Sequence, residues 1–331
     1  MSFIMNIRSV AKYESKILVR SWFFRIFTLL AVVFLGFFNF AMMLMEDNFG
    51  LWFAKSVSSN IPYLNLLLLN TGQAVVAVFL SSEFLKRDKK LDTSEVFYVR
   101  PLSNAEYVVG KIWGNLRVFL FLNLLVLAIV LAFNFMASGV TVDLPAYLVY
   151  FFLISIPTLI FIIGLSIFLM LLLKNQALTF ILLLGYIGLT LFYIQDKFYY
   201  LFDYMVYNLP LFKSTIVGFS NLELILNHRA IYFFAGLGFI FFTIFLFKRL
   251  PNARRSHYPW LFLSFCMFLL MVTAGFRHVR SILWEGEMRA LYTSINNKYV
   301  YEPKMAIDYY DISVEQKSET IRSVVGMEGT A

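Results

Sequence analysis

Seven apolar runs divide this sequence, and each is long enough to cross the hydrocarbon core of a bilayer, which takes about 20 helical residues. We predict membrane-spanning helices over residues 22–45, 61–80, 118–136, 148–173, 177–194, 231–247 and 260–276. Hydrophobic residues make up 60% of the chain, more apolar surface than a soluble domain of this size can hide. We therefore predict an all-α polytopic membrane protein with about six to seven transmembrane helices, and we exclude a soluble enzyme or a disordered chain.

Lysine and arginine residues predict the orientation, because they concentrate in the cytoplasmic loops of membrane proteins. If the N-terminus is cytoplasmic, the inner segments hold most of the 28 basic residues. The outer loops then hold only Lys55, Lys197, Lys213 and Arg229. Seven spans from a cytoplasmic N-terminus place the tail, residues 277–331, in the extracytoplasmic space.

Residues 1–21 have the pattern of an amphipathic helix that lies in the membrane interface. Apolar residues fill one side of the predicted helix, and basic residues recur every four positions on the other. The basic residues are Arg8, Lys12, Lys16 and Arg20. Two interpretations stay open: a positive flank that only sets the topology, and an interfacial helix that contacts a cytoplasmic partner.

The loop between the second and third spans, residues 81–117, combines dense charge with clear helix signals. Asp92 and Glu95 can form a capping box for a short helix, and Pro101 ends that helix. Ser103 and Glu106 form a second capping box, where a helix that runs into the third span should begin. A plain solvated loop is the alternative, but it does not account for two successive helix starts.

The order of residues in this loop resembles the first cytoplasmic loop of type-2 ABC exporter permeases. In that family a glutamate and an arginine end the second span, a Gly-Thr-x-Glu helix follows, and a Pro-x-Ser turn and a Gly-Lys pair lead into the third span. The matching positions are Glu83, Arg87, Asp92, Thr93, Glu95, Pro101, Ser103, Tyr107, Gly110 and Lys111. Asp92 stands where the family usually has glycine.

The general layout of the chain is also similar to that family. The family has an amphipathic connecting helix before the first span, which residues 1–21 match. It also has a hydrophobic, re-entrant-like outer segment between the fifth and sixth spans. Residues 198–226 match that segment, because they are too apolar for a free loop and are broken at Pro210.

The resemblance implies a set of partners and a location. A separate cytoplasmic ABC ATPase, which holds ATP and Mg²⁺, would drive transport, while this chain would bind no cofactor. Residues 92–100, ending at Arg100, would dock into that ATPase, and Glu83 with Arg87 would hold the loop against the second span. A second permease would complete a homodimer or heterodimer, embedded in the lipid of the cytoplasmic (inner) membrane.

The sequence carries no motif for catalysis or for nucleotide binding. Gly110-Lys111 lacks the upstream glycine of a phosphate-binding loop, and neither His-Glu-x-x-His nor Gly-x-Ser-x-Gly occurs. We predict that the pair Gly110 and Gly114, and the pair Gly236 and Gly238, serve helix packing. One cysteine and three scattered histidines predict no disulfide and no metal site. We expect no enzymatic activity in this chain and no nucleic-acid partner.

Four polar residues interrupt the second and third spans, namely Asn65, Asn70, Gln73 and Asn123. Polar groups in lipid need partners, so these side chains either pair between helices or line a translocation path. An aspartate, glutamate or lysine in mid-span is missing, which argues against a proton-driven or sodium-driven transporter.

The tail differs from the rest, because residues 299–314 partly alternate apolar and polar side chains, as a β-strand does. This stretch resembles the first strands of the aminopeptidase-like extracytoplasmic domain that some larger permeases carry after their spans. A simple soluble tail is the alternative.

Taken together, these features favour the permease subunit of an ATP-driven ABC exporter that moves an unidentified, amphipathic substrate. Two alternatives remain. The chain could be a non-transporting membrane scaffold of an ABC-coupled envelope machine, or an unrelated seven-span membrane receptor.

Overall fold

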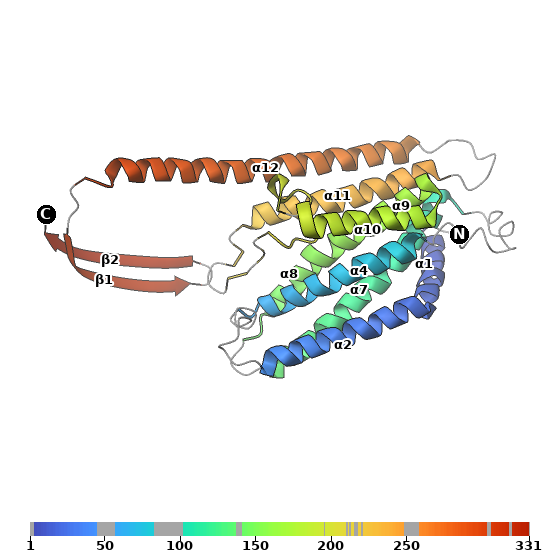
Figure 1. Ribbon diagram of the computed structural model, residues 1–331, viewed down its shortest axis with the longest axis horizontal. Coiled ribbons are helices and arrows are strands. Elements are labelled where there is room, and N and C mark those ends of the chain that lie inside the picture. Colours follow the sequence, from blue (N-terminus) through green and yellow to red (C-terminus); the bar gives the residue numbers. More distant parts are fainter. Residues whose placement is uncertain are drawn as a thin grey trace.

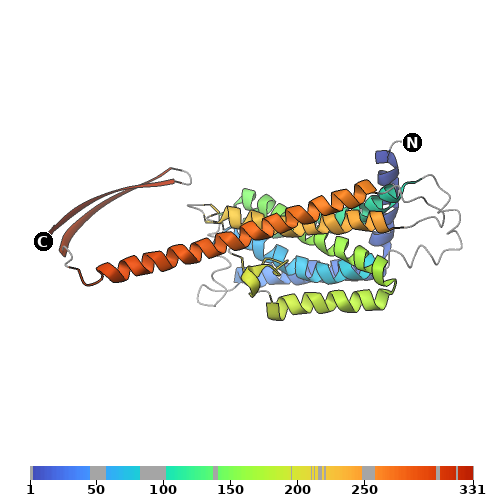
Figure 2. The same cartoon turned by 90° about the horizontal axis from the view of Figure 1, so that it is seen from above.

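The computed structural model of the protein describes residues 3–44, 57–82, 102–136, 141–194, 196–209, 211, 213–214, 218–219, 221–247, 258–302, 306–317 and 320–330. Figure 1 shows a bundle of long helices with a helix across one end, α1 (Phe3–Arg20). The last helix, α12 (Tyr258–Tyr299), projects far beyond the other end (Figures 1 and 2).

Seven helices in the described residues are long and apolar enough to cross a membrane, which confirms the predicted fold class. They are α2 (Trp22–Leu44), α4 (Asn60–Ser82), α7 (Asn104–Met136), the interrupted span Leu144–Leu173, the span Gln176–Ile194, α11 (Leu222–Leu246) and α12. The span Gln176–Ile194 contains α10 (Gln176–Leu189) and a π-turn (Thr190–Ile194).

Three helices extend well past the predicted spans. The helix α7 begins at Asn104, ahead of the span 118–136, as the capping box of Ser103 and Glu106 predicts. The helix α12 continues to Tyr299 rather than ending at 276. The helix α11 begins at Leu222, so Arg229 lies two turns inside a helix and not in an outer loop. Hydropathy marks where the bilayer ends, whereas a helix continues as long as its own backbone hydrogen bonds continue.

The α-helical hydrogen-bond pattern of the fourth span is broken in its middle by a π-turn, just before Pro157, while the helix itself continues. The helix α8 (Leu144–Tyr150) passes through a π-turn (Phe151–Ser155) into α9 (Ile156–Leu173). Pro157 has no N–H group, so the carbonyl of Leu153 lacks its helical donor. Arg229 of α11 supplies that donor, because its Nε lies 2.6 Å from the Leu153 oxygen.

Arg229 also donates hydrogen bonds to three further acceptors. Its guanidinium also donates to the Tyr204 oxygen at 2.9 Å, to Thr158 Oγ1 at 2.8 Å and to the Ile154 oxygen at 3.4 Å. The side chain is buried, so these acceptors replace water as its partners. A single residue therefore ties α11 to the break in the fourth span and to the segment before α11.

The helices α9 and α11 pack with their backbones in contact. A Cβ atom built on Gly236 of α11 would lie 2.7 Å from the Ile160 oxygen of α9. A Cβ atom on Gly164 of α9 would lie 2.6 Å from the Gly236 oxygen. Gly238 faces the ring of Phe268 on α12. The pair Gly236 and Gly238 thus serves helix packing, as predicted.

The outer segment between the fifth and sixth spans is packed into the bundle. Side chains of the three helices α4, α8 and α9, and of Ser59 just before α4, hold its backbone or its side chains. The pairs are Ser59 with the Lys213 oxygen, Tyr63 with the Val206 oxygen, Thr71 with the Tyr207 hydroxyl, Tyr150 with the Leu211 oxygen, and Thr158 with the Tyr204 oxygen. Because Thr71 lies midway along α4, the segment reaches deep into the bundle.

The tail ends in a long hairpin of two antiparallel strands, β1 (Ala306–Lys317) and β2 (Thr320–Thr330). The register pairs Ile312 with Val325 and Glu315 with Arg322. The β character predicted for the tail is therefore present. Between it and the bundle, α12 forms a straight connection (Figure 2).

Candidate functional site

The predicted coupling loop lies mostly outside the described residues. This holds for Glu83, Arg87, Asp92, Thr93, Glu95, Arg100 and Pro101. Ser103 and Lys111 are described, and so are both helices that the loop joins, α4 and α7. The candidate site therefore consists of the base of the loop and of α1, which packs against it.

The second capping box in this loop is confirmed. The backbone N–H of Glu106 donates to Ser103 Oγ at 3.1 Å, and the backbone N–H of Ser103 donates to Glu106 Oε2 at 2.6 Å. The other carboxylate oxygen of Glu106 accepts a hydrogen bond of 2.8 Å from the amide of Asn6 on α1. The start of α7 is thus fixed to the N-terminal helix.

The partner of the glycine pair Gly110 and Gly114 is α1 and not another span. A Cβ atom on Gly110 would lie 2.7 Å from Val10 Cβ. A Cβ atom on Gly114 would lie 2.7 Å from Glu14 Cβ and 2.9 Å from the Ala11 oxygen. The absence of side chains at these two positions of α7 lets the two helix backbones approach closely.

Polar contacts reinforce this close approach. Ser15 Oγ donates to the Gly114 oxygen at 2.7 Å, and it accepts from Arg117 Nε at 2.6 Å. Arg117 also donates to the Ala11 oxygen at 2.8 Å. The close contact excludes water, so these hydrogen bonds supply the Gly114 and Ala11 oxygens with partners that water would otherwise provide.

A buried ion pair lies between the same two helices. Lys111 Nζ is 3.9 Å from Glu14 Oε2, and both side chains are 4% exposed. The ammonium also lies over the ring of Tyr107, 5.0 Å from its centroid. Lys111 therefore binds α1 to α7. The basic residues Arg8, Lys12, Lys16 and Arg20 are exposed on the other side of α1.

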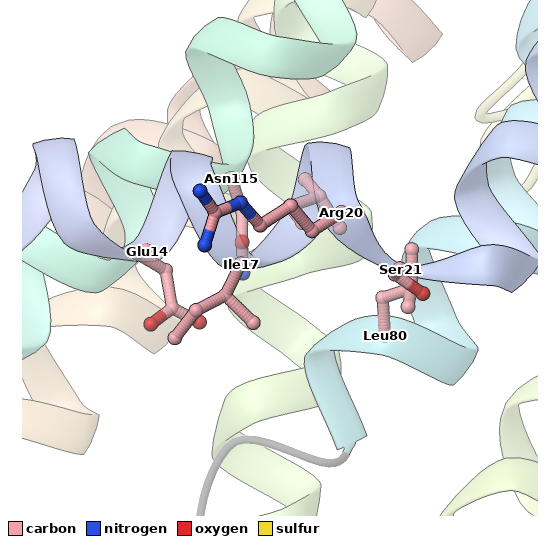
Figure 3. Close-up of a pocket in the computed structure, with 7 residues that line it drawn as sticks. Glu14, Ile17, Arg20, Ser21, Leu80 and Asn115 are labelled. Carbon is pink, nitrogen blue, oxygen red and sulfur yellow. The ribbon is translucent and has the colours of Figure 1, made fainter.

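A surface hollow of about 270 Å³ opens beside this contact, at the end of α4 (Figure 3). It is lined by Glu14, Ile17, Leu18, Arg20, Ser21, Leu80 and Asn115. Leu80 belongs to the last turn of α4, so the hollow lies where the chain leaves that helix for the coupling loop. The three elements α1, α4 and α7 meet at this point.

One of the four predicted polar residues, Asn65 of α4, pairs with Asn39 of α2. Asn39 Nδ2 donates to Asn65 Oδ1 at 2.7 Å, and Asn65 Nδ2 donates to Asn39 Oδ1 at 3.1 Å. Both side chains are buried. This reciprocal pair is an interhelical hydrogen bond of the kind that the packing interpretation expects.

The other three polar residues form one buried network in the middle of the bundle. Asn70 donates to Asn123 Oδ1 at 3.1 Å and to Ser155 Oγ at 3.2 Å. Asn123 donates to Gln73 Oε1 at 2.8 Å, and Ser155 donates to Asn123 Oδ1 at 2.8 Å. Ser155 ends the π-turn, so the network joins α4 and α7 to the broken span.

A second cluster, where α11 begins, has no local signal in the sequence. His228 and His278 face each other with ring centroids 5.1 Å apart. Their Nε2 atoms lie 3.0 Å from the Tyr200 oxygen and 2.9 Å from the Tyr199 oxygen. They therefore hold a turn with positive φ angles. In the described part of the chain, no group of three or more His, Cys, Asp or Glu residues could hold a metal ion.

An aspartate completes this outer region. Asp203 is 2% exposed, and burial raises the pKa of its carboxyl group. Hydrogen bonds from the backbone N–H groups of Asn208 and Tyr207, of 2.8 Å and 3.0 Å, oppose that rise. By accepting these two hydrogen bonds, the carboxylate stabilises the turn between Asp203 and Asn208.

The contact between α1 and α7 leads to a testable expectation. In a Gly114→Leu variant the new side chain would have to occupy the space of Glu14 Cβ and the Ala11 oxygen. We expect α1 to be displaced at a cost of about 1–3 kcal/mol, typical of overpacking. Limited trypsin digestion should then cleave faster at Lys12 and Lys16, while the bundle stays intact. A Gly36→Leu variant, where nothing lies within 4 Å, should keep the parental rate; equal rates in both variants would contradict this view.

The sequence matches no model of a known protein family, and no curated protein matches it. The fold itself defines a multi-pass membrane protein with seven candidate spans in the described residues. Its particular features are the N-terminal helix packed on the base of α7 and the long helix that carries the tail hairpin.

Proposed function

We propose that this protein is the membrane-spanning permease subunit of an ATP-driven exporter of the ABC class. It would lie in the cytoplasmic (inner) membrane with its N-terminus in the cytoplasm. The observation that carries the proposal is the docking of α1 on the base of α7, next to the end of α4. The loop that joins α4 to α7 is the one that resembles the ATPase-contacting loop of that class.

The contacts at the base of the loop would spread a force from the ATPase over several helices. The loop connects α4 with α7, and α7 is fixed to α1 by buried hydrogen bonds and an ion pair. Only Ser21 separates α1 from α2. Pressure on the loop would therefore move α2, α4 and α7 together. Such joint movement of helices is what alternating access requires.

The proposal assigns ATP and Mg²⁺ to the partner ATPase and gives this chain no chemistry of its own. A second permease, identical or related, would form the other wall of the path. The proposed substrate is amphipathic. Asn65, Asn70, Gln73 and Asn123 hydrogen-bond to one another or to Asn39 and Ser155. Asn70 Oδ1 and Gln73 Nε2 are buried without a hydrogen-bond partner, so the network keeps two polar groups for the polar part of such a substrate.

Co-purification with the ATPase tests this function. We expect the tagged wild-type protein, extracted in mild detergent, to bring down a stoichiometric protein that bears a phosphate-binding loop. Glu95→Lys, or deletion of residues 92–99, should reduce that recovery at least tenfold, because the coupling helix would be reversed in charge or removed. Membrane insertion should be unchanged in both variants.

A Glu302→Lys variant is the matched control, since it makes the same charge reversal at an exposed position beyond the end of α12. It should retain the ATPase at the wild-type level. Full retention in the Glu95→Lys and deletion variants would contradict the coupling role of the loop. Recovery of the ATPase without movement of any labelled lipid-like substrate would instead favour the scaffold. The absence of any ATPase would favour a receptor.

A further inference from the structure

The part of α12 that projects beyond the bundle has an apolar stripe along one side. Trp284, Met288, Leu291 and Ile295 follow one another at intervals of four, three and four residues. This is the spacing of the a and d positions of a coiled coil, occupied by apolar residues at four successive positions between Ser281 and Lys298, which hold the flanking a and d positions. Trp284 is 59% exposed, and Leu291 and Ile295 are each 46% exposed. The described residues thus leave the stripe facing solvent.

The stripe does not belong to the packing of the bundle. His278 is the last buried residue of α12, and every residue of the stripe comes after it. Figures 1 and 2 show this half of the helix standing clear of the other helices. Only 11% of the apolar window of α12 is buried, so α12 also lies at the edge of the bundle within the membrane. Another chain can therefore approach α12 along its whole length.

We propose that this stripe is a pairing surface for a second copy of this chain, and that the two projecting helices form a short parallel coiled coil outside the membrane. All copies insert in the same orientation, so two α12 helices that meet must run parallel. A parallel pair places each stripe residue against its own counterpart. Isoleucine at an a position and leucine at a d position are the side chains that favour two strands.

The charges beside the stripe support a second copy rather than an unrelated helix. With Leu291 at position d, Arg280 occupies position g and Glu285 occupies position e. In a parallel pair, the g residue of one helix faces the e residue that lies five positions further along in its partner. Arg280 would thus face Glu285 of the second copy, twice across the symmetry axis. The remaining facing pairs, Glu287 with Tyr292 and Ser294 with Tyr299, bring no like charges together.

The surface is independent of the exporter proposal, because it needs only membrane insertion and the exposed stripe. Disulfide crosslinking in native membranes tests it directly. Cys266 is the single cysteine and is first replaced in a Cys266→Ser background. Leu291→Cys then places a thiol on the stripe. Thr293→Cys places one on the opposite side of the same helix turn, and both positions are exposed. Two differently tagged copies are expressed together and oxidised with copper phenanthroline.

We expect Leu291→Cys to give a product that carries both tags, with a yield at least tenfold above that of Thr293→Cys. Equal yields at the two positions, or no product at Leu291→Cys, would overturn the proposal. A product that joins Leu291→Cys to a different protein would overturn it as well. Recovery of no ATPase in the co-purification experiment would remove the exporter function and leave the crosslinking result unaffected.

A charge exchange provides the second readout. Arg280→Glu in the Leu291→Cys background should lower the crosslinking yield several-fold, because it places two carboxylates opposite each other. Addition of Glu285→Arg should restore the yield, since the pair is then reversed but again attractive. Failure of the double variant to recover would argue against the parallel register.

Discussion

An Arg229→Met variant should lose much of its stability while still inserting into the membrane. The substitution keeps an unbranched apolar chain but removes every hydrogen bond to the Leu153, Ile154 and Tyr204 carbonyls and to Thr158 Oγ1. Each buried acceptor left without a donor costs about 1–3 kcal/mol, and the Tyr204 oxygen keeps its hydrogen bond from Thr158 Oγ1, so the other three acceptors give an expected loss of about 3–9 kcal/mol. The melting temperature in detergent, followed by tryptophan fluorescence, should fall by about 10 °C.

The control for this result is an exposed arginine in another helix. Arg8→Met removes the same charge from the exposed side of α1 and should change the unfolding free energy by no more than about 0.5 kcal/mol. Arg229→Lys should fall between the two, because one ammonium group cannot reach all four acceptors. If Arg229→Met melted at the wild-type temperature, the broken span would not depend on this side chain.

A Gly236→Val variant should force two membrane helices apart and strongly destabilise the bundle. The nearest neighbours of the new Cβ atom would be backbone atoms of Ile160 and Phe161, at 2.7 Å, and backbone cannot rotate away as a side chain can. The helices α9 and α11 would have to separate. We expect a cost of about 3 kcal/mol or more, at the upper end of the range for overpacked cores.

The yield of monodisperse protein in size-exclusion chromatography would measure this effect. Gly185→Val is the matched control, because Gly185 lies in the helix α10 and a Cβ atom added there would have no neighbour within 4 Å. That variant should elute like the wild type with a similar yield. A monodisperse Gly236→Val protein at the wild-type yield would mean that the backbones of α9 and α11 are not in close contact.

Local features of the chain could be predicted, because each depends on residues close together in sequence. The seven apolar helices follow from run length alone. The capping box of Ser103 and Glu106 follows from a spacing of three residues. The strands of the tail follow from the alternation of apolar and polar side chains.

What could not be predicted depends on pairing between distant parts of the chain. The spacing of Gly110 and Gly114 indicates helix packing, but nothing near Gly114 indicates that its partner is Ala11, about a hundred residues earlier. The hydropathy pattern places Arg229 in the loop before the sixth span, because a charged residue is taken to mark the end of an apolar run. The burial of Arg229 becomes explicable only once Pro157 leaves the Leu153 carbonyl without a donor. The roles proposed for Glu83 to Pro101 remain predictions.

Because α12 is one long continuous helix, a small tilt at one end produces a large displacement at the other end. Its 42 residues make a rod about 63 Å long, and its outer half has no neighbour among the described helices to bend it. A tilt of about 10° about its Tyr258 end would swing its far end by about 11 Å, a simple consequence of its length. A fluorescent label on the hairpin would therefore register rearrangements inside the bilayer that are too slight to detect there. If the projecting halves of two α12 helices are joined, a change of tilt in one protomer would be transmitted directly to the other.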